Sequence, residues 1–92
     1  MVSTEVDVDR LSTMLRALGH PARLELIRTM AEGDASCMDL TRHVDLAQST
    51  VSEHLRVLRE AGIIRQCGPG FRSGYCLNRE ALLWLKQNVI AL

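Results

Sequence analysis

Apolar residues recur at helical spacing in the first third of the chain. The first run follows an i, i+3, i+4, i+7 pattern and predicts an amphipathic helix that begins near residues 7–9 and ends at Gly19. Its apolar stripe comprises Leu11, Met14, Leu15 and Leu18. A second helix is expected to begin at Pro21, since proline fits a first helical turn, and to end at Gly33. Its expected stripe comprises Leu24, Ile27, Met30 and Ala31.

Two further helices follow, separated by the short link 44–47. Ser36 and Asp39 have the spacing of a capping box, which predicts a third helix that runs to about His43, with Met38 and Leu40 available to the core. In the fourth helix, which ends at residues 61–62, one stripe is apolar and contains Val51, Leu55 and Leu58. The opposite side carries Ser49, Ser52, Glu53, Arg56 and Glu60, with Gln48 and Arg59 at its edge. This helix therefore has one core face and one face of hydrogen-bonding side chains.

The last part of the chain predicts a β-hairpin and a final helix. Residues 63–67 and 73–77 have the composition of two short strands, and Pro69-Gly70 is a turn signal between them. If those two residues form the whole loop, Cys67 lies opposite Arg72 and Ile64 lies opposite Tyr75. Asn78 is a good N-cap for a helix over 79–92. That helix is apolar on most sides, which favours burial by a second subunit.

The predicted fold class is mainly α with a small β-hairpin, a winged helix-turn-helix in a single domain over residues 1–92. Residues 1–7 are expected to form a flexible acidic tail. In such a domain the fourth helix fits the major groove and offers its N-terminal side chains to base edges, while the hairpin contacts the backbone or minor groove. The expected DNA-contacting residues are Gln48, Ser49, Thr50, Ser52, Glu53, Arg56, Arg42, His43, Arg65 and Arg72.

Composition narrows the function classes. The chain of 92 residues has no net charge, but residues 1–40 hold four basic and seven acidic residues and residues 41–92 hold seven and four. A locally basic half can dock on phosphates. Aromatic residues make up only 3%, which disfavours base-stacking platforms for single strands. Neither a catalytic constellation nor a phosphate-binding loop is present, so we expect no enzyme and no cofactor. A winged-helix module for protein contacts remains the alternative.

Localisation follows from what the sequence lacks. The first ten residues are acidic and contain no apolar signal-peptide core, and no apolar run approaches the roughly 18 residues of a membrane span. The three cysteines, Cys37, Cys67 and Cys76, do not form a disulfide pattern. We therefore expect a cytoplasmic protein with reduced thiols and no membrane partner.

Three segments carry a family resemblance: LRALGHPARLELI, LAQSTVSEHLRVLREAGII and a hairpin that ends in GYCLN. Together they resemble the ArsR/SmtB-type family of bacterial winged-helix repressors. The resemblance implies a homodimer on an inverted-repeat operator, with release by an effector as an option, and an interface between first and last helices. The residues expected at that interface are Leu11, Met14, Leu15, Leu82, Trp84, Leu85 and Val89. Ala47 departs from the Ser or Thr of many members, so the helix loses a side-chain cap worth about 1 kcal/mol.

The resemblance does not supply an effector site. Family arsenic sensors carry C-x-C-D-L at the start of the third helix, whereas this chain has Ser36-Cys37-Met38-Asp39-Leu40, and its last helix lacks the His and Asp of the family's other metal site. On the predicted register, Cys76 lies opposite Ile63, roughly 13 Å from Cys67, too far for one ion or a disulfide. We interpret the cysteines as small packing residues, with a thiol sensor built from Cys37, Cys67 and Cys76 as the alternative.

The three histidines are interpreted without a metal. His20 is expected to order the turn before Pro21, His54 to pack beside the apolar stripe of the fourth helix, and His43 to contact phosphate. None has a second ligand at i+3 or i+4, so no metal site is predicted.

Overall fold

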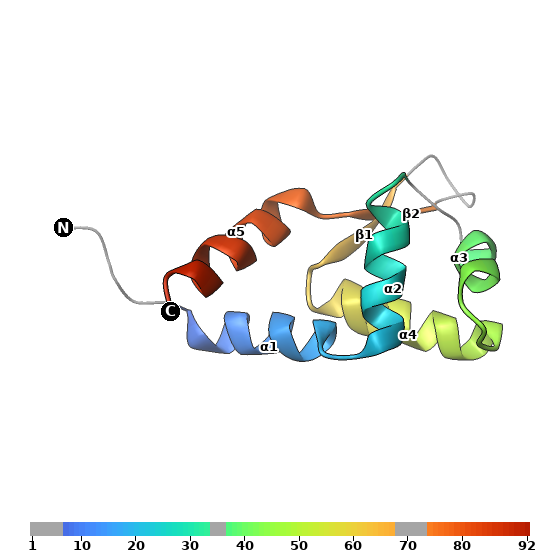
Figure 1. The fold of residues 1–92 in the computed structure, drawn as a ribbon, viewed down its shortest axis with the longest axis horizontal. Helices are drawn as coiled ribbons and strands as arrows, with labels where there is room; N and C mark the ends of the chain where they lie inside the picture. The colour runs from blue at the N-terminus through green and yellow to red at the C-terminus, as the bar shows by residue number, and fades with distance from the viewer. Residues whose placement is uncertain (1–6, 34–36, 68–73) are drawn as a thin grey trace.

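The computed structural model describes residues 7–33, 37–67 and 74–92. Within these ranges, five helices and a two-stranded antiparallel sheet follow one another as predicted (Figure 1). The elements are α1 (Val8–Leu18), α2 (Pro21–Met30), α3 (Cys37–His43), α4 (Gln48–Glu60), β1 (Ile64–Cys67), β2 (Gly74–Leu77) and α5 (Arg79–Ile90). The predicted capping box at Ser36, the turn at Pro69-Gly70, Arg72 and residues 1–6 of the acidic tail lie outside the described residues.

The helix ends follow the capping chemistry of the sequence. The Asp7 carboxylate accepts from the backbone N–H of Arg10 at 3.0 Å and caps α1. Asn78 caps α5 by accepting from the N–H of Ala81 at 3.2 Å, and its side-chain N–H donates to the carbonyl of Gly62 at 3.1 Å. Asn78 therefore ties the start of α5 to the turn after α4, where Gly62 adopts a φ of 79° that favours glycine.

One aliphatic core is shared by all the elements. The stripe predicted for α4 is confirmed, since Val51, Leu55 and Leu58 are almost completely buried. The buried core comprises Leu11, Met14, Ala17, Leu26, Met30, Leu40, Val51, Leu55, Leu58, Ile63, Ile64, Leu77, Ala81 and Leu85. Because α4 places these three side chains in that core, its opposite face is held toward solvent.

The stripe predicted for α2 is partly wrong. Leu24 and Ala31 are exposed, whereas Leu26 and Met30 are buried and Ile27 packs at the edge of the core. The sequence offers two overlapping apolar stripes on this short helix, and contacts with the neighbouring helices and β2 select the second. A similar shift occurs in α1, where Ala17 is buried and Leu15 is 42% exposed.

The predicted hairpin register is wrong by two residues. Cys67 pairs with Gly74, Gln66 with Tyr75, Arg65 with Cys76 and Ile64 with Leu77. The predicted pairs Cys67 with Arg72 and Ile64 with Tyr75 are therefore replaced by pairs two residues further along the second strand. The correct register keeps Ile64 and Leu77 together on the buried face. A Pro-Gly turn signal alone does not predict which residues of the two strands must be buried together.

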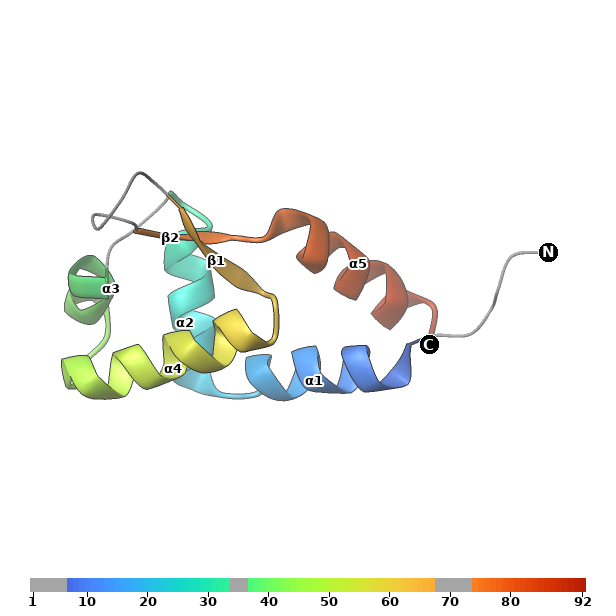
Figure 2. The ribbon, with the colours of Figure 1, turned by 180° about the vertical axis from the view of Figure 1, so that it is seen from behind.

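The elements divide between two ends of the molecule. α1 and α5 lie together at one end, and α3 with the start of α4 lies at the other, as both views show (Figures 1 and 2). At the first end the guanidinium of Arg10 lies 4.0 Å from the ring centroid of Trp84, joining α1 to α5. No helix in the described ranges is long and apolar enough to cross a membrane.

Candidate nucleic-acid interface

The N-terminal turn of α4 lies at one end of the molecule (Figure 2). The first three residues of this turn are polar. Gln48, Ser49 and Ser52 are exposed, as predicted from the helical pattern, and Thr50 is exposed beside them. Ala47 provides no side-chain cap, also as predicted, so the first turn of α4 has no cap from its own N-cap residue. Exposed hydroxyl, amide and backbone N–H groups at a helix N-terminus are suited to phosphate oxygens and base edges.

A charge cluster occupies the next turn of the same face. The Arg56 Nε–H donates to Glu53 at 3.0 Å, its Nη2–H donates to the second Glu53 oxygen, and its Nη1–H donates to Glu60 at 2.8 Å. The hydrogen bonds from Arg56 lower the pKa of the Glu53 carboxyl, and the same bonds raise the pKa of Arg56. Without DNA the guanidinium is therefore held by two carboxylates, so contact with a base or phosphate requires exchange of these partners.

Sequence reasoning treated Arg56 and Glu53 as separate DNA contacts and missed this pairing. The i, i+3 spacing of Glu53 and Arg56 and the i, i+4 spacing of Arg56 and Glu60 were the available signals. Glu53 thus has a role beyond the DNA contact predicted for it, because it orients the arginine that faces solvent beside it.

A second cluster fixes α4 relative to α1 and α2. His20 caps α2, since its Nδ1 accepts from the N–H of Ala22 at 3.1 Å, and this agrees with the role predicted for it. Arg23 donates from Nε to His54 Nδ1 at 3.1 Å and from Nη1 to the carbonyl of Ala17 at 3.3 Å. The rings of His20 and His54 lie 4.5 Å apart between centroids. Arg23 thereby joins the end of α1 to the middle of α4, a long-range link that the sequence did not indicate.

This cluster predicts a pH-dependent stability. Burial lowers the pKa of His54, the positive charges of His20 and Arg23 lower it further, and Glu53 opposes the shift. The unfolded chain, with an ordinary histidine pKa of about 6.5, then binds the proton more readily than the folded chain. The stability gained from neutral His54 is complete above that pH and is lost as the pH falls through the lowered folded-state pKa. We expect His54→Gln to flatten the fall in urea midpoint between about pH 7.5 and about pH 5.

The matched control is His43→Gln, because His43 is an exposed histidine on α3 outside this hydrogen-bonded cluster. It should retain the wild-type pH slope. Equal slopes for wild type and His54→Gln would contradict the assigned role of His54.

The remaining predicted DNA contacts lie in two places. Arg42 and His43 are exposed at the end of α3, and Arg42 pairs with Asp39 at 3.7 Å. His43 and Thr50 line one pocket, so the end of α3 and the start of α4 form a continuous surface. Arg65 is exposed on β1, on a different pocket lined by hairpin residues.

The residues predicted at a dimer interface divide by burial. Leu11, Met14 and Leu85 are buried in the core of this chain, and Leu82 and Trp84 pack partly against it. Leu15 and Val89 are exposed. The other large exposed apolar side chains on α1, α5 and the chain end are Val8, Leu83, Ile90 and Leu92.

The cysteines are closer than the sequence predicted. Cys67 and Cys76 line the same pocket on the hairpin. The predicted separation of roughly 13 Å is wrong, because it was based on the wrong register. Cys37 is the first residue of α3, and the structure describes its backbone but not its side chain. In the described ranges no group of three or more His, Cys, Asp or Glu residues is arranged to hold a metal ion.

Comparison with known proteins identifies the family. The profile described as "Bacterial regulatory protein, arsR family" matches residues 20–66, which run from the cap of α2 into β1. The arsenical resistance operon repressor of Staphylococcus xylosus is 33% identical over 79 residues, covering 86% of this chain and 76% of the relative. The chain belongs to the ArsR family of bacterial regulatory proteins.

Other relatives agree with this assignment. The biofilm growth-associated repressor of Agrobacterium fabrum is 46% identical over 54 residues, covering 59% of this chain and 46% of the relative, so this chain matches about half of its length. The solution structure of a homodimeric winged helix-turn-helix DNA-binding domain from Mycobacterium bovis has a TM-score of 0.74 at 21% identity, covering 98% of this chain and 90% of that one. The predicted winged helix-turn-helix fold is confirmed, and the family is one of DNA-binding transcriptional regulators rather than enzymes.

Proposed function

We propose that this ArsR-family chain is a cytoplasmic, homodimeric transcriptional repressor that binds an inverted-repeat operator through the N-terminal half of α4. The observation that carries the proposal is the division of α4 into a buried apolar stripe and an exposed polar face. The stripe holds the helix rigidly, and the polar face carries residue types that read base edges in the major groove.

Each exposed side chain of α4 has a chemistry that suits this reading. Gln48 is able to bond adenine with two hydrogen bonds, and Arg56 is able to bond guanine in the same way once it exchanges its carboxylate partners. Ser49, Thr50 and Ser52 supply hydroxyls for bases or phosphates. Outside α4, Arg42, His43 and Arg65 supply phosphate contacts that set the register of the protein on the duplex. Arg72, which follows Arg65 in the sequence, is proposed as a further contact of the same kind.

The proposed dimer interface uses the end of the molecule opposite the start of α4. Exposed apolar side chains gather on α1 and α5, where Leu83 is 55% exposed and Ile90 is 85% exposed. A small domain gains stability by covering such a surface. The Mycobacterium bovis domain with this fold is homodimeric, which supports a dimer here. A two-fold dimer would present two copies of α4 to half-sites spaced by about one helical turn, ~34 Å, or a multiple of it.

A protein-interaction module would need a different α4 surface. Protein interfaces are centred on aromatic or large apolar anchors. The exposed positions of α4 are all polar or charged, from Gln48 to Glu60. The relatives with repressor names favour DNA as the partner.

The test is a selection from random duplex DNA with the full chain under reducing conditions, followed by anisotropy titrations of the enriched duplex and a scrambled duplex of equal length. We expect an inverted repeat to be enriched and to bind at least about a thousandfold more tightly than the scrambled duplex at near-physiological salt. Failure to enrich any sequence, or equal binding of both duplexes, would refute the proposal.

A further inference from the structure

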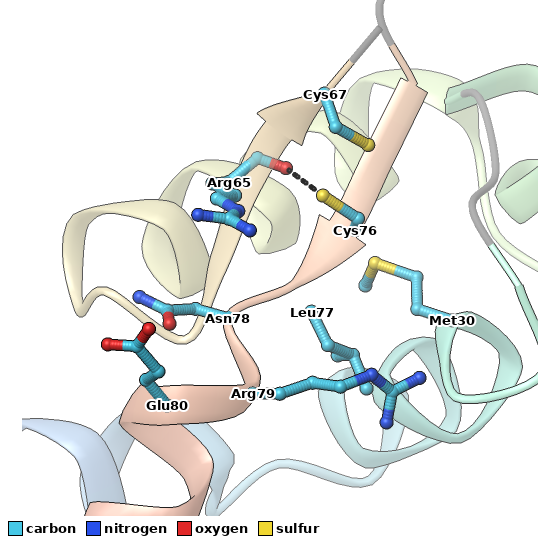
Figure 3. A pocket seen from close by; sticks show the side chains of 8 residues that line it. All are labelled: Met30, Arg65, Cys67, Cys76, Leu77, Asn78, Arg79 and Glu80. Atoms are coloured by element: carbon cyan, nitrogen blue, oxygen red, sulfur yellow. Dashed lines mark hydrogen bonds between the residues drawn. The ribbon is translucent and has the colours of Figure 1, made fainter.

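Three sulfur-bearing side chains from separate elements line one pocket beside the hairpin. Cys67 comes from β1, Cys76 from β2 and Met30 from the end of α2 (Figure 3). Neither thiol forms a disulfide, and both cysteines are half-buried. The Cys76 thiol donates to the carbonyl of Arg65 at 3.7 Å. Three soft donor atoms therefore face one partly enclosed space.

The strand register sets how the two thiols can meet. Arg65 pairs with Cys76, and Cys67 lies two residues beyond Arg65, so the two cysteines are diagonal neighbours on the same face of the hairpin. Diagonal neighbours have Cα atoms about 7–8 Å apart, which is at or beyond the limit of about 7 Å for a disulfide. Two thiolates that share one ion need a sulfur–sulfur distance of only about 4 Å, at metal–sulfur bonds of about 2.3 Å. The diagonal therefore suits a bridging ion better than a disulfide.

We propose that Cys67, Cys76 and Met30 form a binding site for a soft monovalent cation, Cu(I). Thiolate and thioether ligands select soft ions such as Cu(I). Zn²⁺ forms structural sites with four nitrogen, sulfur or oxygen ligands, and no cluster of His, Cys, Asp and Glu large enough for that exists in the described part of the chain. On binding, both thiols release a proton to solvent, each thiolate forms a bond to the ion, and no electron is transferred.

The charges around the pocket fit the complex. One Cu(I) ion with two thiolates carries a net charge of −1. Arg65 and Arg79 also line the pocket, and their two positive charges exceed the single negative charge of Glu80. The excess positive charge of the two arginines therefore compensates the negative charge of the Cu(I) complex. A divalent ion with two thiolates would be neutral and would not require this compensation.

The bound ion would join the hydrogen-bonded hairpin of β1 and β2 to the end of α2. It would thereby fix the hairpin relative to the helices. Control of DNA binding by this link rests on the proposed function, whereas ion binding itself does not. The two are therefore measured separately.

The test is anaerobic competition for Cu(I) against a chromogenic chelator of known affinity, with the reduced full chain. We expect one Cu(I) ion per chain. Since loss of an outer-shell partner already costs 10–100-fold in metal affinity, Cys67→Ser and Cys76→Ser should each weaken binding by at least about 100-fold. Met30→Leu conserves volume in the core and should weaken binding by about tenfold or more with the fold retained by circular dichroism.

Cys37→Ser is the matched control, because it removes the third cysteine of the chain and should leave Cu(I) affinity unchanged. No stoichiometric binding by the wild type, or wild-type affinity in both hairpin cysteine variants, would overturn the site. Equal affinity for Zn²⁺ would overturn the assignment to a soft ion. Cu(I) binding by a chain that enriches no DNA sequence would leave the site standing and refute the proposed function, and the converse result would do the opposite.

Discussion

Ser49→Glu is expected to reduce operator binding to the non-specific level while the fold remains intact. Ser49 is exposed in the first turn of α4, so the new carboxylate would meet base edges and phosphates in the proposed complex. Specific binding by such domains exceeds non-specific binding by a factor of about 10³–10⁷, so we expect a loss of at least about a thousandfold in an anisotropy titration.

The same substitution should not destabilise the free protein. A negative charge in the first turn of a helix is favourable by about 0.3–1 kcal/mol, and α4 has no side-chain cap from Ala47. The midpoint of thermal unfolding should therefore stay the same or rise slightly. Ser49→Ala separates the effect of losing the hydroxyl from the effect of adding a charge. It removes the hydroxyl without adding charge and should cost about 1 kcal/mol in DNA binding. Unchanged operator affinity in Ser49→Glu would show that this turn of α4 lies outside the DNA complex.

The sequence predicted α4 well because its two faces differ in every turn. Val51, Leu55 and Leu58 leave only one way to bury the helix, and the polar face follows from that choice. In α2, Leu24 and Leu26 begin two competing stripes, and only packing against the other elements decides between them. Local periodicity therefore predicts a burial pattern reliably where one stripe is dominant.

The hairpin and the side-chain clusters were less predictable for different reasons. A turn signal at Pro69-Gly70 limits where a loop lies but not its length, so it does not determine the register of the strands. The register is determined by the burial of Ile64 and Leu77 on one face. The link from Arg23 to His54 joins residues 31 positions apart, which no local pattern reports. The pairing of Arg56 with Glu53 and Glu60 is local and was available from spacing.

The double variant Leu83→Glu with Ile90→Glu is expected to convert the proposed dimer to a monomer. Both side chains are large, apolar and exposed on α5, so the substitutions should leave the core of the chain intact. In a two-fold dimer each substitution enters the interface twice and buries charge without a partner. We expect the dimer to weaken by about 3 kcal/mol or more, roughly a hundredfold, in sedimentation velocity experiments.

The choice of residues depends on the burial pattern. Leu85→Glu, on the same helix, is not informative, because Leu85 is 6% exposed in the isolated chain and a carboxylate there would disrupt the core itself. Leu24→Glu is the matched control, since Leu24 is 47% exposed on α2, outside the proposed α1–α5 interface, and should sediment as the wild type does.

The oligomeric state and DNA binding together locate the interface. A monomeric double variant should bind a single half-site as the wild-type monomer would, and should lose the additional affinity for the complete inverted repeat, because the second α4 is no longer held at a fixed spacing. If the double variant remains a dimer, the subunits meet through another surface. If it is monomeric but binds the complete repeat with wild-type affinity, the dimer contributes nothing to operator recognition and that part of the proposed function is wrong.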